Sequence, residues 1–227
     1  MYKKILTQQQ IDLLPLLQKF SKSYYLVGGT AIALHIGHRR SIDFDLFSSK
    51  KNINRTHIKK TISKCNFSIQ HLIYENSDQL HIIINSVKLT FYNFPYTIDS
   101  NEKLDNIISF PSLLDLGAMK AFALGRRAKW KDYVDMYFLF KNHFNLNDIT
   151  IRANELFGKE FSSKLFRQQL CYFDDIDFSE TIDFIDENVP EYVVKTFLTD
   201  VSTLQFNKDQ EQAYVKGIHN STLPFQS

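Results

Sequence analysis

The spacing of apolar and polar positions divides this chain into two parts. Through the first hundred residues, segments with a strand period of two alternate with segments of helical period. After Phe110 and Pro111, only the helical period continues. We therefore expect an α+β fold, in which a small mixed β-sheet with helices on one side is followed by a helical C-terminal region. The division falls near 95–110, which gives a first domain at 1–100 and a helical domain at 101–227.

The first part is expected to contain three helices and five strands. The helices span 8–22, 30–36 and 54–65, and the strands span 24–27, 41–47, 67–74, 80–85 and 87–94. Gly37 is placed to end the second helix, and a tight turn at Asn85 and Ser86 joins the last two strands. The helices of the second part are expected at 112–124, 131–142, 146–157, 162–170 and 191 to about 205.

The expected strand at 41–47 carries two carboxylates. Its apolar positions alternate with Asp43, Asp45 and Phe47. Residues two apart on a strand project from the same face, so this spacing directs Asp43 and Asp45 toward one point. Paired carboxylates can hold Mg²⁺ together with substrate phosphates. The alternative is two solvent-exposed aspartates on an edge strand, because Asp-x-Asp is a weak signal by itself.

A glycine turn, Gly28-Gly29-Thr30, precedes this strand and opens a helix. Glycines there let the chain approach a triphosphate closely, and the helix N-terminus favours its negative charge. The alternative is an ordinary strand-to-helix turn. Together with Asp-x-Asp, the turn indicates a metal-dependent enzyme that acts on a nucleoside triphosphate. Arg39 or Arg40, in the connecting loop, could contact a phosphate or balance the charge of the aspartates. A pair of solvent-exposed arginines is about equally consistent with the sequence.

A second group of charged residues lies at 120–135. Lys120 stands near the middle of an otherwise apolar helix, where a charged side chain is seldom buried unless it is paired. A lysine can bind phosphate as a compact charge. Asp132 could be a third carboxylate of the site, acting as metal ligand or general base. The alternative is an acid near the N-terminus of its helix, where the helix dipole favours a negative charge. Asp135 is expected to pair with Lys131 or Arg127.

Charge is unevenly distributed along the chain, although the net charge is only +2. Residues 1–60 contain eleven Lys and Arg against three Asp, which suits polyanions such as nucleotides or RNA. Residues 174–187 contain seven acids and no base. This acidic stretch fits a surface segment, a segment docked on the basic part, or a surface for a basic partner. No apolar run is long enough to cross a bilayer, and we expect a cytoplasmic protein.

Two motif blocks, LVGGTAIALHIGHRRSIDFDLF and MKAFALGRRAKWKDYVDMYFL, resemble the AbiEii/AbiGii-type nucleotidyltransferase toxins of the DNA polymerase β-like superfamily. The resemblance covers residues 20–145 and implies a nucleotidyltransferase core for the α+β part. It implies that Gly28 and Gly29 form the triphosphate loop and that Asp43 and Asp45 are metal ligands. It further implies that Lys120 binds the triphosphate and that Asp132 completes the site.

The resemblance also implies a function. Family members are toxins of bacterial toxin–antitoxin or phage-defence loci, and some add nucleotides to tRNA acceptor ends. The expected activity is therefore Mg²⁺-dependent transfer of a nucleoside monophosphate from an NTP to an acceptor such as a tRNA 3′ end, with a cognate antitoxin as partner. Two alternatives remain: modification of a protein or small molecule by nucleotidylation or phosphorylation, and a non-catalytic binding protein with a degenerate site.

The sequence departs from the family pattern at two positions. The glycine turn often reads Gly-Ser, whereas here Thr30 follows two glycines and would supply the hydroxyl contact to phosphate. The wider superfamily places a third acid on a later strand, where this chain has Thr90. The resemblance therefore leaves two possibilities: Asp132 substitutes for that acid, or the metal site is weaker.

Overall fold

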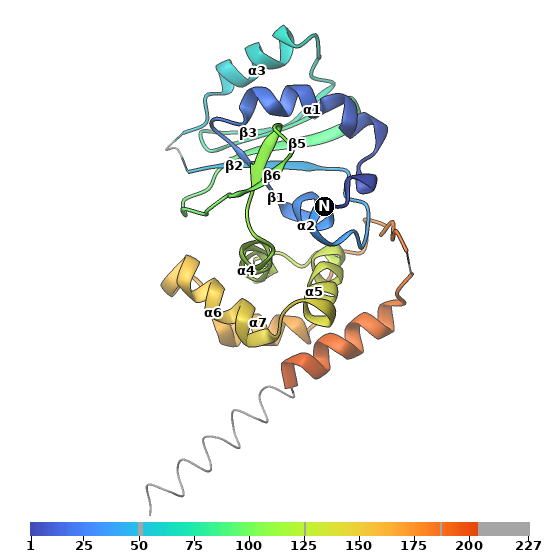
Figure 1. Ribbon diagram of the computed structural model, residues 1–227. Helices are drawn as coiled ribbons and strands as arrows, with labels where there is room; N and C mark the ends of the chain where they lie inside the picture. The colour runs from blue at the N-terminus through green and yellow to red at the C-terminus, as the bar shows by residue number, and fades with distance from the viewer. Residues whose placement is uncertain (50–51, 125, 187, 204–227) are drawn as a thin grey trace, which may run out of the picture.

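The computed structural model of this chain describes residues 1–49, 52–124, 126–186 and 188–203. Its main sheet has five strands in the order β1-β2-β5-β4-β3 (Figure 1). The strands are β1 Tyr25–Val27, β2 Phe44–Ser48, β3 His71–Glu75, β4 Gln79–Ile84 and β5 Val87–Asn93. β2 and β5 run parallel and all other neighbours run antiparallel, which confirms a mixed sheet.

Two helices cover one face of this sheet. α1 (Gln8–Phe20) and α3 (Arg55–Lys64) lie on the same side of it in Figure 1. Phe20 of α1 packs edge-on against Phe91 of β5, with ring centroids 5.0 Å apart. Phe91 pairs with Leu46 across the strands, and both side chains are fully buried. Because side chains alternate along a strand, Asp45 and Thr90 project from the opposite face.

The local turn signals of the sequence are confirmed. α2 (Gly28–Ile36) begins directly after β1 and ends at Gly37, whose φ of 71° is the left-handed conformation of a helix C-cap. Asn85 and Ser86 have φ of 50° and 61°, the mirror-image turn geometry that joins antiparallel strands. These signals are short-range, so the sequence alone suffices to place them.

The strand expected at 41–47 begins later than its alternation indicates. β2 starts at Phe44, and Asp43 lies in the loop before it. The hydroxyl of Thr30 is within hydrogen-bond reach of the carbonyl oxygens of both Ser41 and Asp43, so α2 holds this loop. Ile42, expected on the apolar face, is 58% exposed. The expectation that Asp43 and Asp45 lie on one strand was therefore wrong, because the strand does not reach Asp43.

The expected boundary region contains a hairpin that the sequence analysis did not predict. β6 (Glu102–Leu104) and β7 (Ile108–Phe110) pair antiparallel, and β7 packs beside β1 and α1. One hydrophobic core runs through both parts of the chain. The division near residue 100 stays a prediction.

After this hairpin, the main regular elements of the described chain are helices, as expected. α4 (Leu113–Leu124), α5 (Trp130–Asn142), α6 (Leu146–Phe157) and α7 (Ser163–Leu170) are followed by a helix at 191–203. The expected end of that last helix, at about residue 205, lies outside the described residues. Among the residues that the structure describes, no helix combines the length and apolar character needed to cross a membrane.

Residues 173–186, here called the acidic strap, dock on the basic part of the chain. The strap passes the start of α5, where Trp130 N–H donates to the Asp177 carbonyl, and reaches the loop after α2, where Arg40 N–H donates to the Asp183 carbonyl. Glu180 forms ion pairs with Lys129 and Lys131, at 2.7 and 2.5 Å. The strap thus docks on the basic part at Arg40 and Lys4 and also on the start of α5, while most of its residues stay at the surface.

Candidate active site

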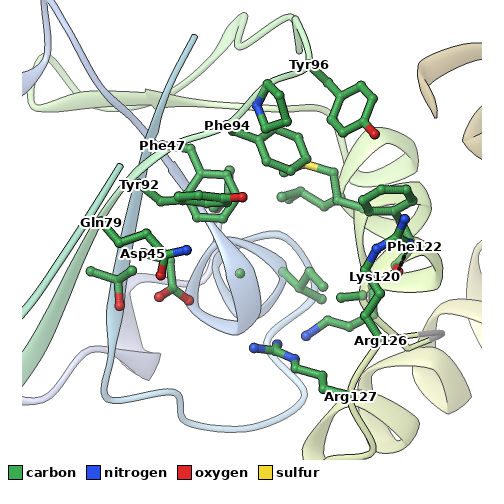
Figure 2. A pocket seen from close by; sticks show the side chains of 18 of the residues that line it. Asp45, Phe47, Gln79, Tyr92, Phe94, Tyr96, Lys120, Phe122, Arg126 and Arg127 are labelled. Carbon is green, nitrogen blue, oxygen red and sulfur yellow. Dashed lines mark hydrogen bonds between the residues drawn. The ribbon is translucent and has the colours of Figure 1, made fainter. Parts of the chain in front are cut away.

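A cavity of about 560 Å³ lies between the open face of the sheet and α4. Figure 2 shows its two ends, which differ in chemistry. Asp45, Lys120 and Arg127 lie at the charged end. Five aromatic side chains line the other end: Phe47, Tyr92, Phe94, Tyr96 and Phe122. The cavity thus joins a charged region to an aromatic region.

Gly28 brings the N-terminus of α2 against the carboxylate of Asp45. A Cβ atom built on Gly28 would lie 2.3 Å from Asp45 Oδ2, and the φ of Gly28 is +74°. Both facts require glycine, because other residues rarely adopt this φ and any side chain would displace the carboxylate. Gly29 is similarly confined, since a Cβ there would lie 2.5 Å from a guanidinium nitrogen of Arg39. The two glycines therefore serve close packing of charged groups around the helix start.

The two aspartates differ in their surroundings. Within the described part of the chain, the Asp45 carboxylate has no hydrogen bond or ion pair, and it lines the cavity. Asp43 Oδ2 lies 3.2 Å from Lys88 Nζ and 3.7 Å from Lys131 Nζ. Asp45 is therefore the carboxylate available to a ligand, and Asp43 is already neutralised by two ammonium groups.

Thr90 stands directly opposite Asp45 on the neighbouring strand, and it lines the cavity. This is the position at which the sequence analysis noted the missing third acid. Thr30, by contrast, is buried, and its hydroxyl bonds the loop before β2 rather than facing the cavity. Thr30 thus holds the backbone on either side of Asp43.

Lys120, Asp132 and Arg127 form one ion-paired group between α4 and α5. Lys120 Nζ lies 2.7 Å from Asp132 Oδ1, and Arg127 Nε donates to Asp132 Oδ2 at 2.9 Å. The Lys120 side chain is 4% exposed and Asp132 is fully buried, whereas the Arg127 side chain is 51% exposed. Asp132 therefore lies beneath the part of the cavity surface that Lys120 and Arg127 form.

Asp135, one turn along α5, extends this group to the loop after α2. Its carboxylate accepts hydrogen bonds from Arg39 Nε at 2.7 Å and His38 Nε2 at 2.9 Å, and lies 2.8 Å from Lys120 Nζ. The expected partners of Asp135, Lys131 and Arg127, were therefore wrong. Arg39 and His38 could not be identified from spacing, because they lie 96 and 97 residues away in sequence.

The charges in this group stabilise one another. Burial alone would raise the pKa of Asp135, but Arg39 and Lys120 outweigh it and hold that pKa well below its usual range. Burial likewise opposes the charge on Lys120, and Asp132 with Asp135 reverses the effect, so its pKa is raised. Burial lowers the pKa of His38 despite its bond to Asp135, so His38 is neutral near pH 7. Burial would raise the pKa of Asp132, but Lys120 and Arg127 lower it, so Lys120, Asp132 and Asp135 are all ionised near neutral pH.

Arg40 is the expected phosphate ligand that lies away from this cavity. Its Nε lies 3.2 Å from Asp183 of the acidic strap, and its guanidinium donates to the Lys4 carbonyl. The aromatic end of the cavity, in turn, was missed by the sequence analysis. Its rings come from β2, β5, the segment after β5 and α4, and their alternation with apolar core residues gave no separate signal.

The donor set at the charged end fits Mg²⁺. Carboxylate oxygens are the ligands that this ion prefers, and Asp45 offers them without a protein partner in the described chain. At Asp43 the metal would have to compete with the ammonium groups of Lys88 and Lys131. No group of three or more His, Cys, Asp or Glu that could hold a metal occurs among the described residues, so substrate phosphates would have to complete the coordination.

The chain is similar to several known proteins. An uncharacterised protein of Aquifex aeolicus (strain VF5) is 28% identical over 156 residues, which cover 67% of this chain and 74% of that protein. The crystal structure of JHP933 from Helicobacter pylori matches with a TM-score of 0.55 and 16% identity, over 95% of this chain and all of that one. MenT4, a nucleotidyltransferase toxin from Mycobacterium tuberculosis H37Rv, matches with a TM-score of 0.55 and 12% identity, over 86% and 81% of the two chains.

The solved structures share the fold, and a family model gives the function class. The model described as nucleotidyl transferase AbiEii toxin, type IV toxin–antitoxin system, matches residues 15–191. That span covers more than half of the chain and includes both motif blocks, so the resemblance seen in the sequence is confirmed. The protein is therefore a nucleotidyltransferase that belongs to the AbiEii toxin family.

Proposed function

We propose that this enzyme uses Mg²⁺ to transfer a nucleoside monophosphate from an NTP to a hydroxyl group of an acceptor such as a tRNA 3′ end. The observation that carries the proposal is the Asp45 carboxylate, unpaired within the described residues and held by Gly28 against the start of α2. Lys120 and Arg127 line the same cavity. A carboxylate, a helix N-terminus and two cations meeting in one cavity suit a metal-bound triphosphate.

The reaction breaks one bond and forms one. The acceptor oxygen attacks the α-phosphorus, the bond from that phosphorus to the oxygen bridging the β-phosphate breaks, and pyrophosphate leaves. The proton of the acceptor hydroxyl is released to water. Positioning and charge neutralisation provide most of the catalysis in such transfers, so the protein's task is to hold the phosphates in line with the acceptor.

Each group at the charged end has a role in that task. The backbone N–H groups of Gly28 and Gly29 open α2 and favour negative phosphate oxygens. Arg127, half exposed at the cavity surface, keeps N–H groups available for phosphate. Asp45 would hold the metal together with Asp43, whose ammonium partners Lys88 and Lys131 the metal would displace, and the metal would neutralise phosphate charge.

Lys120 and Asp132 contribute mainly through one another. Lys120 is almost fully buried and already pairs with two carboxylates, so it adds positive potential beneath the triphosphate. Asp132 keeps Lys120 and the exposed Arg127 in place and acts as a positioning residue. This interpretation predicts that Asp132→Asn raises KM for the NTP more than it lowers kcat.

Transfer of radioactive label tests the proposal. Purified protein is incubated with each NTP labelled at the α-phosphate, total tRNA and Mg²⁺, and parallel reactions contain either EDTA or label at the γ-phosphate. We expect α-label, but no γ-label, in the tRNA, and none in EDTA. Label from the γ-phosphate would instead identify a kinase. Absence of any transfer from all four NTPs would contradict the proposal.

The toxin role has a separate test in cells. The family is that of type IV toxin–antitoxin systems, which implies a cognate antitoxin encoded with the toxin. We expect induced expression of the wild-type chain to stop growth and Asp45→Asn to remove that effect at equal protein level. Growth arrest by both proteins would show that the toxicity does not depend on nucleotidyl transfer.

A further inference from the structure

Two rows of side chains cross the open face of the sheet, from β2 through β5 to β4. Strand pairing places Asp45, Thr90 and His81 in the first row. The second row contains Phe47, Tyr92 and Gln79. All six residues line the cavity. Two residues along a strand span roughly 6.7 Å, a distance that a ribose can bridge between a phosphate held by the first row and a base held by the second.

The aromatic end offers a ring from the sheet as one wall. Tyr92 meets Phe47 edge-on at a centroid distance of 5.0 Å, so the neighbouring ring fixes its orientation. Tyr92 is only partly buried. Its hydroxyl has no hydrogen bond to any residue that the structure describes. A ring that is fixed and partly exposed is suited to stack against a flat ligand.

Arg126, on the helix side of the cavity, forms the other wall of the aromatic end. Its guanidinium lies 3.5 Å from the centroid of the Phe122 ring. Phe157 stacks on Phe122 at 4.0 Å and 22°, and must occupy the other face because both groups cannot fit on one. Arg126 also donates to the carbonyls of Phe122 and Glu160, each at 3.1 Å. The planar guanidinium is thus held in place at the cavity, which it lines.

We propose that the aromatic end of the cavity binds a nucleobase, which stacks between the Tyr92 ring and the Arg126 guanidinium. This inference rests on the proposed function and specifies which part of the substrate this end receives. Bases stack on aromatic rings and on arginine planes alike. A cavity with one charged and one aromatic end matches a nucleotide, which joins charged phosphates to a flat base. Figure 2 shows Tyr92 on the sheet side and Arg126 beside Phe122 on the helix side.

Gln79 is placed to read the edge of that base. It pairs with Tyr92 across β4 and β5, so its side chain stands next to the stacking ring. Its Oε1 accepts from His81 Nε2 at 2.9 Å, which fixes the amide and leaves the NH₂ group to donate to a base acceptor. Gln79→Ala therefore reduces the difference in affinity between the preferred NTP and the other three.

Calorimetric titration tests the stacking site directly. The wild-type chain and its variants are titrated in Ca²⁺ with the four NTPs, with inorganic tripolyphosphate, and with a short RNA ending in a free 3′ hydroxyl. Tyr92→Leu removes the ring, Tyr92→Phe retains it, and Arg126→Lys removes the planar group but keeps the charge. Tyr192→Leu is the matched control, because Tyr192 is 71% exposed on the last helix. Thermal unfolding confirms that each variant is folded.

Three results decide the inference. Tyr92→Leu and Arg126→Lys should weaken binding of the preferred NTP by about tenfold or more, and their binding of tripolyphosphate should not change. Tyr92→Phe and Tyr192→Leu should bind the NTP as the wild-type chain does. The same loss confined to the RNA would also support a nucleobase site, and would assign it to the acceptor. Unchanged binding of both NTP and RNA by Tyr92→Leu would overturn the inference while the proposed function stands. If wild-type protein transfers no label, the proposed function itself fails.

Discussion

A Cβ atom on Gly28 would lie 2.3 Å from Oδ2 of Asp45, which ties the start of α2 to the carboxylate in the cavity. Gly28→Ala should therefore displace Asp45 and lower the rate of nucleotidyl transfer by about 100-fold, the scale expected for misplacing a reacting group by 1 Å. Radiolabel transfer at saturating NTP measures this rate.

The matched control for this variant is Gly158→Ala. Gly158 also has a positive φ, of +53°, but a Cβ there would meet nothing within 4 Å. Both substitutions strain the backbone and should lower the free energy of unfolding by about 1 kcal/mol or more. Only Gly28→Ala should lose activity. Equal activity of the two variants would mean that the contact with Asp45 has no part in catalysis.

Thr90 stands opposite Asp45, where an acidic residue would add a further carboxylate beside that of Asp45. Thr90→Asp should increase Mg²⁺ affinity roughly tenfold, because affinity follows the number of charged ligands. Without metal the added charge repels Asp45, so the melting temperature should fall and then recover on adding Mg²⁺. Thr90→Asn, equal in size and uncharged, is the control. No gain in Mg²⁺ affinity would place the metal away from Asp45.

Burial lowers the pKa of His38 below its ordinary value of 6.5. Below that pH the unfolded chain binds a proton that the folded chain does not, so the free energy of unfolding must decrease as pH falls. His38→Gln keeps a donor for Asp135 but cannot titrate. Between about pH 7.5 and about pH 5.5, urea unfolding should show a smaller decrease for the variant, by up to about 1.4 kcal/mol per pH unit. Equal decreases would exclude His38 as the source.

Glu180 of the acidic strap shares Lys131 with Asp43, since Lys131 Nζ lies 2.5 Å from Glu180 and 3.7 Å from Asp43. Glu180→Gln should leave the Lys131 ammonium to Asp43, where it competes with the metal. An exposed ion pair contributes roughly 0.4–1 kcal/mol. The Mg²⁺ concentration for half-maximal transfer should therefore rise about two- to fivefold.

Asp186→Asn is the comparison for the strap, because Asp186 pairs only loosely with Lys4, at 3.6 Å between exposed side chains. That variant should leave the Mg²⁺ requirement unchanged. An equal shift in both variants would indicate a general effect of strap charge and not the shared lysine.

Features that depend on neighbouring residues were predictable from the sequence. Gly37 ends α2 because glycine adopts the left-handed conformation without strain. Apart from the hairpin of β6 and β7, the order of strands and helices followed from apolar periodicity. The family resemblance pointed to Thr90 as the position of a missing third acid, and the structure pairs Thr90 with Asp45. Asp43 was misplaced because alternation continues in sequence beyond the point where Thr30 draws the backbone toward α2.

Features that depend on distant residues were not predictable. Asp135 is bound by His38 and Arg39 from a loop nearly a hundred residues away, whereas sequence spacing suggested only the nearby cations Arg127 and Lys131. The two walls of the aromatic end come from β5 and from the segment directly after α4. Neither the alternation of β5 nor an arginine after a helix end indicates that the two face the same cavity.

If Asp45 acts on the triphosphate, Asp45→Asn should transfer α-label much more slowly than the wild-type chain, and this rate is the decisive measurement. The control is Asp12→Asn, which changes an exposed aspartate of α1 that bonds only Gln8 among the described side chains. We expect Asp45→Asn to lose at least about 100-fold in rate with its melting temperature retained, while Asp12→Asn remains active. Transfer by Asp45→Asn at the wild-type rate would contradict it.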